Sequence, residues 1–235
     1  MIDLLDAAAP LARFAVDLRG ATRSAPDLAS HGDDDRDAAR QVWAARIIDE
    51  YRSVAVFAEL LHLLTDLEAP FAALCAVQHL IGDELRHTSW CASVAGWLGG
   101  HGDLGIDLAD IGLPPRGDQP KARRAFDIVG RELVVAEEES IAMFAAYRDA
   151  TVEPALRAVL VDLLRDEVRH AATGRALFQL FTRGPLATTV SERDRAELAA
   201  TMATDRADLR ARYRATARGG AGRALGASIE AVDLR

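Results

Sequence analysis

Apolar residues recur along this chain with the spacing of amphipathic helices and not with the alternation of half-buried strands. Segments with this helical spacing span about residues 2–19, 37–65, 70–98, 121–148, 154–182 and 192–216. β-Branched and aromatic residues are sparse, while alanine, leucine and arginine dominate. Ser191 is in position to cap the last segment. The pattern therefore predicts an all-α protein.

The connections between these segments divide the helices into two hairpins. Short turns at 66–70 and 149–154 join the helices within each hairpin, and the Gly- and Pro-rich stretch over 100–120 forms a long crossover between them. This order predicts a four-helix bundle with ferritin-like connectivity and extra helices at both ends. The expected regions are an N-terminal helix and loop (1–36), the bundle (37–184), and a C-terminal helix with a flexible tail (185–235).

A five-residue signature occurs once in each hairpin, on its second helix. The copies read Asp83-Glu84-Leu85-Arg86-His87 and Asp166-Glu167-Val168-Arg169-His170. Each copy places a glutamate and a histidine three residues apart, so that they project from one helix face. A carboxylate and an imidazole presented together twice are typical of a two-metal site inside a helical bundle.

The first hairpin offers a further glutamate at the same height as its signature. Residues at equal distances from a hairpin turn lie side by side, and Glu84 lies 17 residues after Leu67. Counting back 17 residues from Leu67 gives Glu50. Glu59 is a rival ligand, but it lies nine residues from Glu50 and so on the opposite helix face.

The same count in the second hairpin gives a matching residue. Glu167 lies 15 residues after Val152, and counting back 15 residues gives Glu137. Glu138 follows directly, so a register shift of one residue would replace Glu137 by Glu138. Each hairpin thus supplies one glutamate from its first helix and a Glu-x-x-His pair from its second.

The resulting set contains four carboxylates and two imidazoles. The candidate metal ligands are Glu50, Glu84, His87, Glu137, Glu167 and His170. Four carboxylates neutralise two divalent cations, and this mixed oxygen and nitrogen set suits iron or manganese. Glutamate can bridge two metals, and neutral histidine keeps the set from becoming too anionic.

The aspartates of the two signatures have an expected role beside the histidines. A metal-bound imidazole usually donates its other N–H to a carboxylate, which fixes the tautomer. We expect a crossed arrangement, in which Asp83 contacts His170 and Asp166 contacts His87. The signature arginines are expected to neutralise these aspartates; they are Arg86 and Arg169.

The doubled Asp-Glu-x-Arg-His with upstream glutamates resembles the ferritin-like diiron-carboxylate superfamily, which includes rubrerythrin-type proteins and bacterial multicomponent monooxygenase hydroxylases. The string Glu-Tyr-Arg-Ser-Val-Ala-Val-Phe at 50–57 is similar to the Glu-x-x-Ser-Val-Ala-x-Phe run of bacterial ferritin-like domain proteins. The resemblance covers about residues 45–175. It implies the same six ligands and two iron ions, with manganese or a mixed iron–manganese pair as alternatives.

The resemblance implies a non-haem diiron oxidase or oxygenase. Such a protein uses O2 to oxidise a small organic substrate by hydroxylation, N-oxygenation or desaturation, with electrons from an external donor. Two alternatives stay open: a non-enzymatic iron-binding or iron-storage protein, and a rubrerythrin-like peroxide reductase that depends on an external electron donor. Histidine at both metal positions favours the oxidase over a ferritin ferroxidase centre.

The charge and the cysteine content of the chain limit which binding partners and which appended domains we expect. The net charge of −8 comes from scattered acidic residues, which argues against nucleic acid or an anionic membrane as a partner. Cys75 and Cys91 are the only cysteines, so a rubredoxin-like or zinc-ribbon appendage is excluded. The N-terminus lacks the features of a signal peptide, and we expect a cytoplasmic protein. The arginine-rich stretch over 206–218 indicates a solvated or homodimer-facing helix.

Several residues near the signatures have two interpretations. His62 and His79 have apolar neighbours in the sequence, which predicts core or boundary positions, with a substrate pocket as the alternative. A second group is predicted to be core, with a cavity beside the metals as the alternative. Its members are Ser53, Phe57, Met143 and Phe144.

Overall fold

The computed structural model describes residues 2–3, 25–29, 31–100, 105–106 and 118–216, and this part of the chain is almost entirely helical. The long helices are α2 (Asp33–Asp66), α3 (Phe71–Trp97), α6 (Pro154–Thr182) and α7 (Glu192–Thr216). Between α3 and α6 runs a continuous helical segment made of α4 (Lys121–Ile128), η1 (Val129–Ala136) and α5 (Glu137–Ala150). A short 3₁₀ turn, η2 (Ala187–Thr189), precedes α7.

The predicted ends of the bundle helices lie within a few residues of the observed ones. The largest difference is at the start of α2, which begins at Asp33 and not near Asp37. The first turn contains Asp33, Asp34 and Asp35, and carboxylates interact favourably with the positive end of a helix dipole. This acidic run, predicted to belong to a loop, therefore extends the helix.

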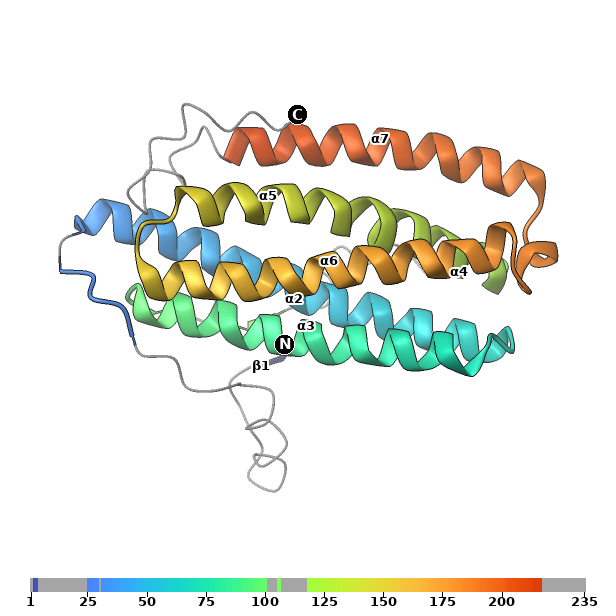
Figure 1. Cartoon of the computed structure of the whole chain (residues 1–235), viewed down its shortest axis with the longest axis horizontal. Coiled ribbons are helices and arrows are strands. Elements are labelled where there is room, and N and C mark those ends of the chain that lie inside the picture. The colour runs from blue at the N-terminus through green and yellow to red at the C-terminus, as the bar shows by residue number, and fades with distance from the viewer. Residues whose placement is uncertain (1, 4–24, 30, 101–104, 107–117, 217–235) are drawn as a thin grey trace, which may run out of the picture.

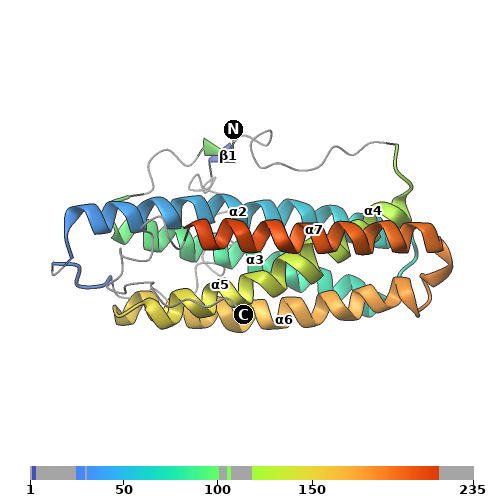
Figure 2. The ribbon, with the colours of Figure 1, turned by 90° about the horizontal axis from the view of Figure 1, so that it is seen from above.

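The long helices form two antiparallel hairpins (Figure 1). α2 pairs with α3, and the α4–η1–α5 segment pairs with α6. Contacts between α2 and α4 and between α3 and α6 join the hairpins into one bundle. α7 packs against η1 and α5, and Figure 2 shows it running along the bundle between α2 and α5. The two hairpins predicted from the turn positions are confirmed.

The interior of the bundle consists of two apolar clusters with a polar layer between them. The first cluster includes Phe57, Leu64, Phe126, Leu133 and Phe181. The second includes Trp43, Ile47, Phe144, Leu160 and Leu163. Along α2, members of the second cluster precede Glu50 and members of the first follow it. Charged side chains in the polar layer are therefore shielded from water on both sides.

Side chains at two helix starts bind backbone N–H groups that have no partner within the helix. The Glu153 carboxylate accepts a hydrogen bond from the backbone N–H of Leu156, with Pro154 in the first turn of α6. Ser191 Oγ accepts from the backbone N–H of Asp194 at 3.1 Å, and the Asp194 carboxylate accepts from the backbone N–H of Ser191 at 2.9 Å. The N-cap predicted at Ser191 is confirmed.

The third helix of the bundle departs from α geometry in its middle. Predicted as one helix over about 121–148, it contains the eight-residue π-helix η1. α6 approaches this segment closely at Gly174, where an added Cβ would overlap the backbone oxygen of Leu133. π turns within α-helices are frequent at functional sites. This one ends directly before Glu137.

The N-terminal segment corrects one prediction. Ile2–Asp3, predicted to begin an amphipathic helix over 2–19, form β1, which pairs antiparallel with β2 (Gly105–Ile106). A partner strand distant in sequence can override local helical periodicity, because side-chain packing and pairing decide strand formation. The rest of that predicted helix, most of the crossover and the tail beyond Arg218 lie outside the described residues.

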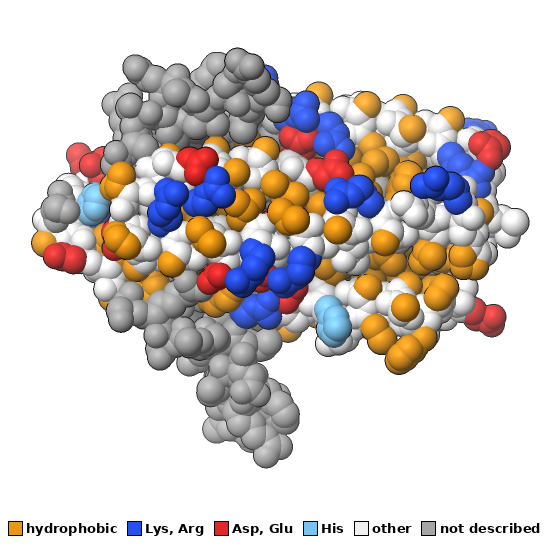
Figure 3. Space-filling view, in the orientation of Figure 1, with side chains coloured by type: hydrophobic (Ala, Val, Ile, Leu, Met, Phe, Trp, Pro, Cys, Tyr) orange, Lys and Arg blue, Asp and Glu red, His pale blue; other side chains and the backbone are white. Residues whose placement is uncertain are grey.

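Charges of both signs are mixed on the outer surface. On the face shown in Figure 3, Lys and Arg side chains lie beside Asp and Glu side chains, and apolar side chains separate these groups. Within the described ranges, none of the helices combines the length and the apolar character that crossing a bilayer requires.

Candidate metal centre

Six charged side chains meet in the polar layer between the two apolar clusters. They are Glu50 from α2, Glu84 and His87 from α3, Glu137 from α5, and Glu167 and His170 from α6. All six are buried, which is rare for charged groups unless they are paired or bind a metal. Two triads place their ligand atoms within 4.8 Å of one another: Glu50, Glu84 and His87, and Glu84, Glu137 and His170. The structure thus brings together all six residues that the sequence selected.

The His87 imidazole directs Nδ1 into a group of carboxylates. This nitrogen lies 3.5 Å from Glu50 Oε2, 3.8 Å from Glu84 Oε2 and 3.7 Å from Glu167 Oε1. It is buried and has no hydrogen-bond partner. A buried ring nitrogen without a partner is costly unless it coordinates something. This geometry fits a metal ligand.

The His170 imidazole has equivalent surroundings. Its Nδ1 lies 3.1 Å from Glu84 Oε1, 3.7 Å from Glu137 Oε2 and 3.8 Å from Glu167 Oε2. This nitrogen is also buried without a hydrogen-bond partner. The two imidazole rings are 5.5 Å apart between centroids. The centre therefore has two similar halves, one for each histidine.

Two carboxylates lie between the halves. Glu84 places Oε2 toward His87 and Oε1 toward His170, and Glu167 places Oε1 toward His87 and Oε2 toward His170. Glu50 contacts only the first histidine and Glu137 only the second among these ion pairs. The geometry therefore suits Glu84 and Glu167 as shared ligands of two cations, and Glu50 and Glu137 as ligands of one cation each.

Aspartates contact both imidazoles at Nε2, the nitrogen that faces away from the glutamates, in the crossed arrangement predicted from the sequence. Asp166 Oδ2 lies 3.3 Å from His87 Nε2, and Asp83 Oδ2 lies 3.2 Å from His170 Nε2. When Nε2–H donates to the aspartate, Nδ1 is left with a lone pair that faces the glutamates. The aspartates thus select the tautomer that binds a cation.

The signature arginines contact both aspartates, as predicted. Arg86 donates to Asp83 and, at 3.0 Å, to Asp166. Arg169 lies 3.2 Å from Asp83 and 2.9 Å from Asp166. Burial raises the pKa of Asp166, but hydrogen bonds from His87 and Arg86 outweigh it and lower the pKa to about 2. Asp166 is therefore a carboxylate at neutral pH.

The centre favours positive charge. Burial lowers the pKa of His87, but contacts with Asp166 and the glutamates outweigh it and raise the pKa well above its ordinary value. Burial and the neighbouring carboxylates, Glu137 first among them, raise the pKa of Glu167. Burial also raises the pKa of Glu50, yet Arg46 and His87 lower it to about 2. Four clustered carboxylates thus attract protons or cations.

The structure separates the true members of the centre from their rivals. Glu137 lies beside His170, whereas Glu138 points to α7 and accepts from Arg206 at 2.8 Å. Glu59 lies away from the centre and binds Arg124 through both carboxylate oxygens at 3.0 Å. The register that gives Glu137 is therefore the one present.

His62 and His79 correct a prediction. His62, predicted at a core or boundary position, has a side chain that is 72 % exposed and lies 3.6 Å from Asp66. His79 is exposed as well. Successive helix residues point about 100° apart, so apolar sequence neighbours of a histidine face other directions. Neither histidine belongs to the core or to the centre.

Two side chains that contact the centre belong to no motif and were not selected from the sequence. Arg46 donates to Glu50 Oε1 at 2.5 Å, and its guanidinium carbon lies 4.7 Å from the centroid of the Phe144 ring. Trp90 stacks on His87 with 5.6 Å between ring centroids. Helical spacing could have found both, because Arg46 is four residues from Glu50 and Trp90 is three residues from His87.

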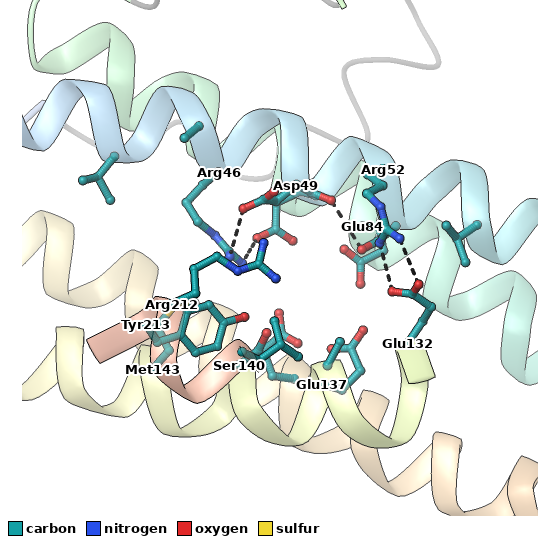
Figure 4. A pocket seen from close by; sticks show the side chains of 18 of the residues that line it. Arg46, Asp49, Arg52, Glu84, Glu132, Glu137, Ser140, Met143, Arg212 and Tyr213 are labelled. Atoms are coloured by element: carbon teal, nitrogen blue, oxygen red, sulfur yellow. Dashed lines mark hydrogen bonds and ion pairs between the residues drawn. The ribbon is translucent and has the colours of Figure 1, made fainter. Parts of the chain in front are cut away.

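A cleft of about 900 Å³ reaches the centre between α2, α5 and α7 (Figure 4). The four central glutamates border it. Of the residues predicted to be core, Phe57 and Met143 are buried and also line the cleft, Phe144 is buried, and Ser53 is half-buried and lines the cleft. The alternative interpretation, a cavity beside the glutamates, therefore holds for three of the four residues.

The two ends of the cleft differ. At one end, Arg52 donates to both carboxylate oxygens of Glu132 at 2.9 Å, and this pair links α2 to η1 (Figure 4). At the other end lie Arg46, Ser140 and Tyr213. One end thus carries an arginine paired with a glutamate, and the other carries Arg46 with two hydroxyl groups.

Helix α7 forms one wall of the cleft and is fixed by ion pairs. Arg206 donates to Glu139 Oε1 at 2.7 Å and Arg210 donates to Glu139 Oε2 at 2.8 Å. Arg131 of η1 donates to Asp205 of α7 at 2.6 Å. Glu139 is buried, so these hydrogen bonds satisfy a carboxylate that would otherwise be costly to bury. The helix is therefore held against the bundle.

Comparison with known proteins identifies no relative: no protein-family model, no curated protein and no solved structure matches this chain.

Proposed function

We propose that this protein is a ferritin-like, non-haem dinuclear iron oxidase or oxygenase. The observation that carries the proposal is the pair of buried imidazole nitrogens, His87 Nδ1 and His170 Nδ1, which lack hydrogen-bond partners and face four buried glutamates. Removing cations from such a set would leave clustered negative charge in a water-poor layer. Two divalent cations balance the four carboxylates.

The donor set supports iron or manganese over other metals. Carboxylate oxygens with one imidazole per cation are the hard, mixed ligands that Fe(II) and Mn(II) accept, and no thiolate lies among them. Glu50, Glu84 and His87 would hold one cation, and Glu137, Glu167 and His170 the other, with Glu84 and Glu167 shared. When bound, two ferrous ions supply the reducing electrons for O2 activation.

The cleft supports a small organic substrate over metal storage or peroxide removal. It borders all four glutamates, and a volume of about 900 Å³ admits a molecule much larger than peroxide or a hydrated ion. The chain's own residues bind and orient that molecule, while Phe57, Met143 and the Arg52–Glu132 pair restrict water. An oxygenase also needs electrons from outside, so we propose an external electron donor.

Metal content tests the centre. The purified protein is loaded anaerobically with Fe(II), desalted and analysed for iron per chain. Wild type should hold two iron ions, and His87→Ala and Glu167→Gln should each lose stoichiometric iron. Glu138→Gln is the matched control, because Glu138 is the direct neighbour of Glu137 but binds arginine. Full iron occupancy in both ligand variants would refute the metal centre.

Rapid mixing with O2 tests the reaction class. The anaerobic ferrous protein is mixed with O2-saturated buffer in a stopped-flow spectrophotometer, with and without candidate organic substrates. An oxygenase should show a transient visible absorption band whose decay accelerates with a substrate that is then recovered in oxidised form. Rapid oxidation by hydrogen peroxide with slow reaction toward O2 would replace the proposal by a peroxide reductase. Accumulation of a ferric mineral in large assemblies would replace it by storage.

A further inference from the structure

The end of the cleft formed by α7 presents hydrogen-bond donors. Figure 4 shows Tyr213 projecting from α7 with its hydroxyl toward the middle of the cleft, above Ser140. The hydroxyls of Ser140 and Tyr213 both line this end of the cleft, and each can donate one hydrogen bond. The Tyr213 hydroxyl is therefore in position to donate to a ligand in the cleft.

Arg46 adds a second donor at the same end. Its Nη2 donates to Glu50 and its Nη1 lies 3.5 Å from Asp49 Oδ2, but its Nε is buried and has no hydrogen-bond partner. Arg212 of α7 lines this end too, beside Arg46 in Figure 4. A buried N–H without an acceptor is costly, and a ligand oxygen would satisfy it. The buried Nε–H of Arg46 therefore lacks a hydrogen-bond acceptor that a ligand could supply.

The balance of charge at this end favours an anion. The Arg46 side chain is 13 % exposed, whereas that of its neighbour Asp49 is 60 % exposed. Asp208, which also lines the cleft, is exposed. Water screens the exposed aspartates, while the guanidinium acts from a site with little solvent. Glu50, which pairs with Arg46, is one of the four glutamates that the two proposed cations balance, so a ligand group beside Tyr213 then experiences mainly the positive charge.

We propose that the cleft takes a small organic acid, whose carboxylate is bound by Tyr213 Oη and Arg46 at the α7 end. The rest of the molecule lies between Met143 and Leu209 and extends to Glu137, at the border of the centre. This assignment rests on the proposed oxidase function, because it identifies the substrate class of the same site. Tyr213 is then a specificity-determining residue supplied by the added C-terminal helix.

Equilibrium binding tests the proposal without any turnover. The full chain is loaded with redox-inert Zn(II), and ligand-observed NMR titrations compare carboxylates with alcohols of matched shape. The probes are benzoate, 3-phenylpropanoate and octanoate, with benzyl alcohol, 3-phenylpropanol and octanol as neutral partners. At least one acid should bind about tenfold more tightly than its alcohol, as expected for a hydrogen bond to a charged group. 3-Phenylpropylamine should bind more weakly than both.

The Tyr213→Phe variant separates this carboxylate site from direct binding to the metal. The variant should lose about tenfold in affinity for the acid and keep its affinity for the alcohol. Tyr51→Phe is the matched control, because Tyr51 lies on α2 outside the cleft and should leave both affinities unchanged. Circular dichroism and zinc content verify that each variant is folded and loaded.

Three results would overturn the proposal: equal affinity for acids and alcohols, preference for the amine, or acid binding that Tyr213→Phe leaves intact. The last result would mean that the carboxylate binds the metal itself. Failure of the oxidase function is distinguishable from these results. Selective acid binding that depends on Tyr213, in a protein whose ferrous form does not react with O2, would retain the anion site and reject only the oxidase.

Discussion

The two hairpins carry the same signature but hold it in different surroundings. Glu50, in the first hairpin, lies on a regular α-helix and accepts a hydrogen bond from Arg46 at 2.5 Å. Glu137, in the second, directly follows the π-helix η1. The arginines nearest to it in the second hairpin and α7 bind its sequence neighbours Glu138 and Glu139. Nearly symmetric ligand positions therefore have unequal charge and unequal backbone geometry.

The repeated motif therefore fixes which residues are the ligands, but it does not fix how strongly each half of the centre binds its cation. Arg46 reduces the net negative charge around His87, whereas the half around His170 has no equivalent arginine contact among the described ion pairs. A cation in the first half must compete with a guanidinium for Glu50. We therefore expect the two metal positions to load unequally, with the His170 half filled first.

The largest expected effect separates shared ligands from single-position ligands. Glu84→Gln should remove both metal ions, because Glu84 faces both histidines. Glu50→Gln and Glu137→Gln should each reduce binding to about one ion, since each carboxylate serves one half. Metal analysis after Fe(II) loading measures the difference. If Glu84→Gln lost no more metal than Glu50→Gln, the division into shared and single ligands would be wrong.

The backbone difference between the hairpins gives the next effect. Gly174→Ala should lower the free energy of unfolding by about 3 kcal/mol, because the new methyl group would overlap the backbone of η1 at Leu133. Gly82→Ala, in the first hairpin, has open space around its Cβ and should raise stability by about 0.5–1 kcal/mol through helix propensity. Urea unfolding of the metal-free proteins measures both. Equal responses would contradict a close approach confined to the second hairpin.

Local sequence patterns were enough to predict the bundle helices and to select the six residues that meet in the centre. Helical periodicity gave the helix bounds, and equal counting from each turn gave Glu50 and Glu137, because antiparallel helices with similar rise stay in register near the turn. The crossed contact between Asp83 and His170 followed from the twofold repeat. These predictions needed only spacing along the chain.

Features that depend on distant packing were missed. The π-helix over Val129–Ala136 has no spacing signature, and the segment packs closely against Gly174 of another helix. The Arg52–Glu132 pair joins residues 80 positions apart, and many other arginines could have paired with that glutamate. Tyr213 enters the cleft only because α7 folds back along the bundle. Interactions between elements therefore determine the shape of the cleft, whereas spacing within elements determines the centre.

The aspartate behind His87 should contribute stability that depends on pH. Folding lowers the pKa of Asp166 from 3.8 to about 2, so the folded state favours the carboxylate. This contribution is fully present above about pH 4 and is lost as the pH falls toward 2. Asp166→Asn should therefore cost about 2 kcal/mol at pH 7 in the metal-free protein, and less at pH 3. Unfolding by urea at both pH values measures this.

A control separates this pH effect from general acid sensitivity. Asp149→Asn changes an exposed carboxylate at the turn of the second hairpin and should alter stability by less than about 0.5 kcal/mol at either pH. If the difference between wild type and Asp166→Asn grew on acidification, Asp166 would not be held as a carboxylate in the folded protein.

The smallest expected effect tests the inequality of the two metal positions directly. Arg46→Met keeps an unbranched, though shorter, apolar side chain beside Phe144 and removes the positive charge beside Glu50. Without that charge, a cation in the His87 half no longer competes with a guanidinium, and its affinity should rise about tenfold. The His170 half should change little. Stepwise Mn(II) titration followed by electron paramagnetic resonance measures both binding constants.

Arg175→Met is the matched control for this titration. Arg175 also pairs with a glutamate, donating to Glu138 at 2.9 Å, but that glutamate faces away from the centre. Its removal should therefore leave both Mn(II) constants unchanged. Two equal constants in wild type, or weaker first-half binding in Arg46→Met, would contradict the electrostatic difference between the hairpins. The second result would instead make Arg46 a support for Glu50, because a glutamate that loses its only arginine could turn away from the cation.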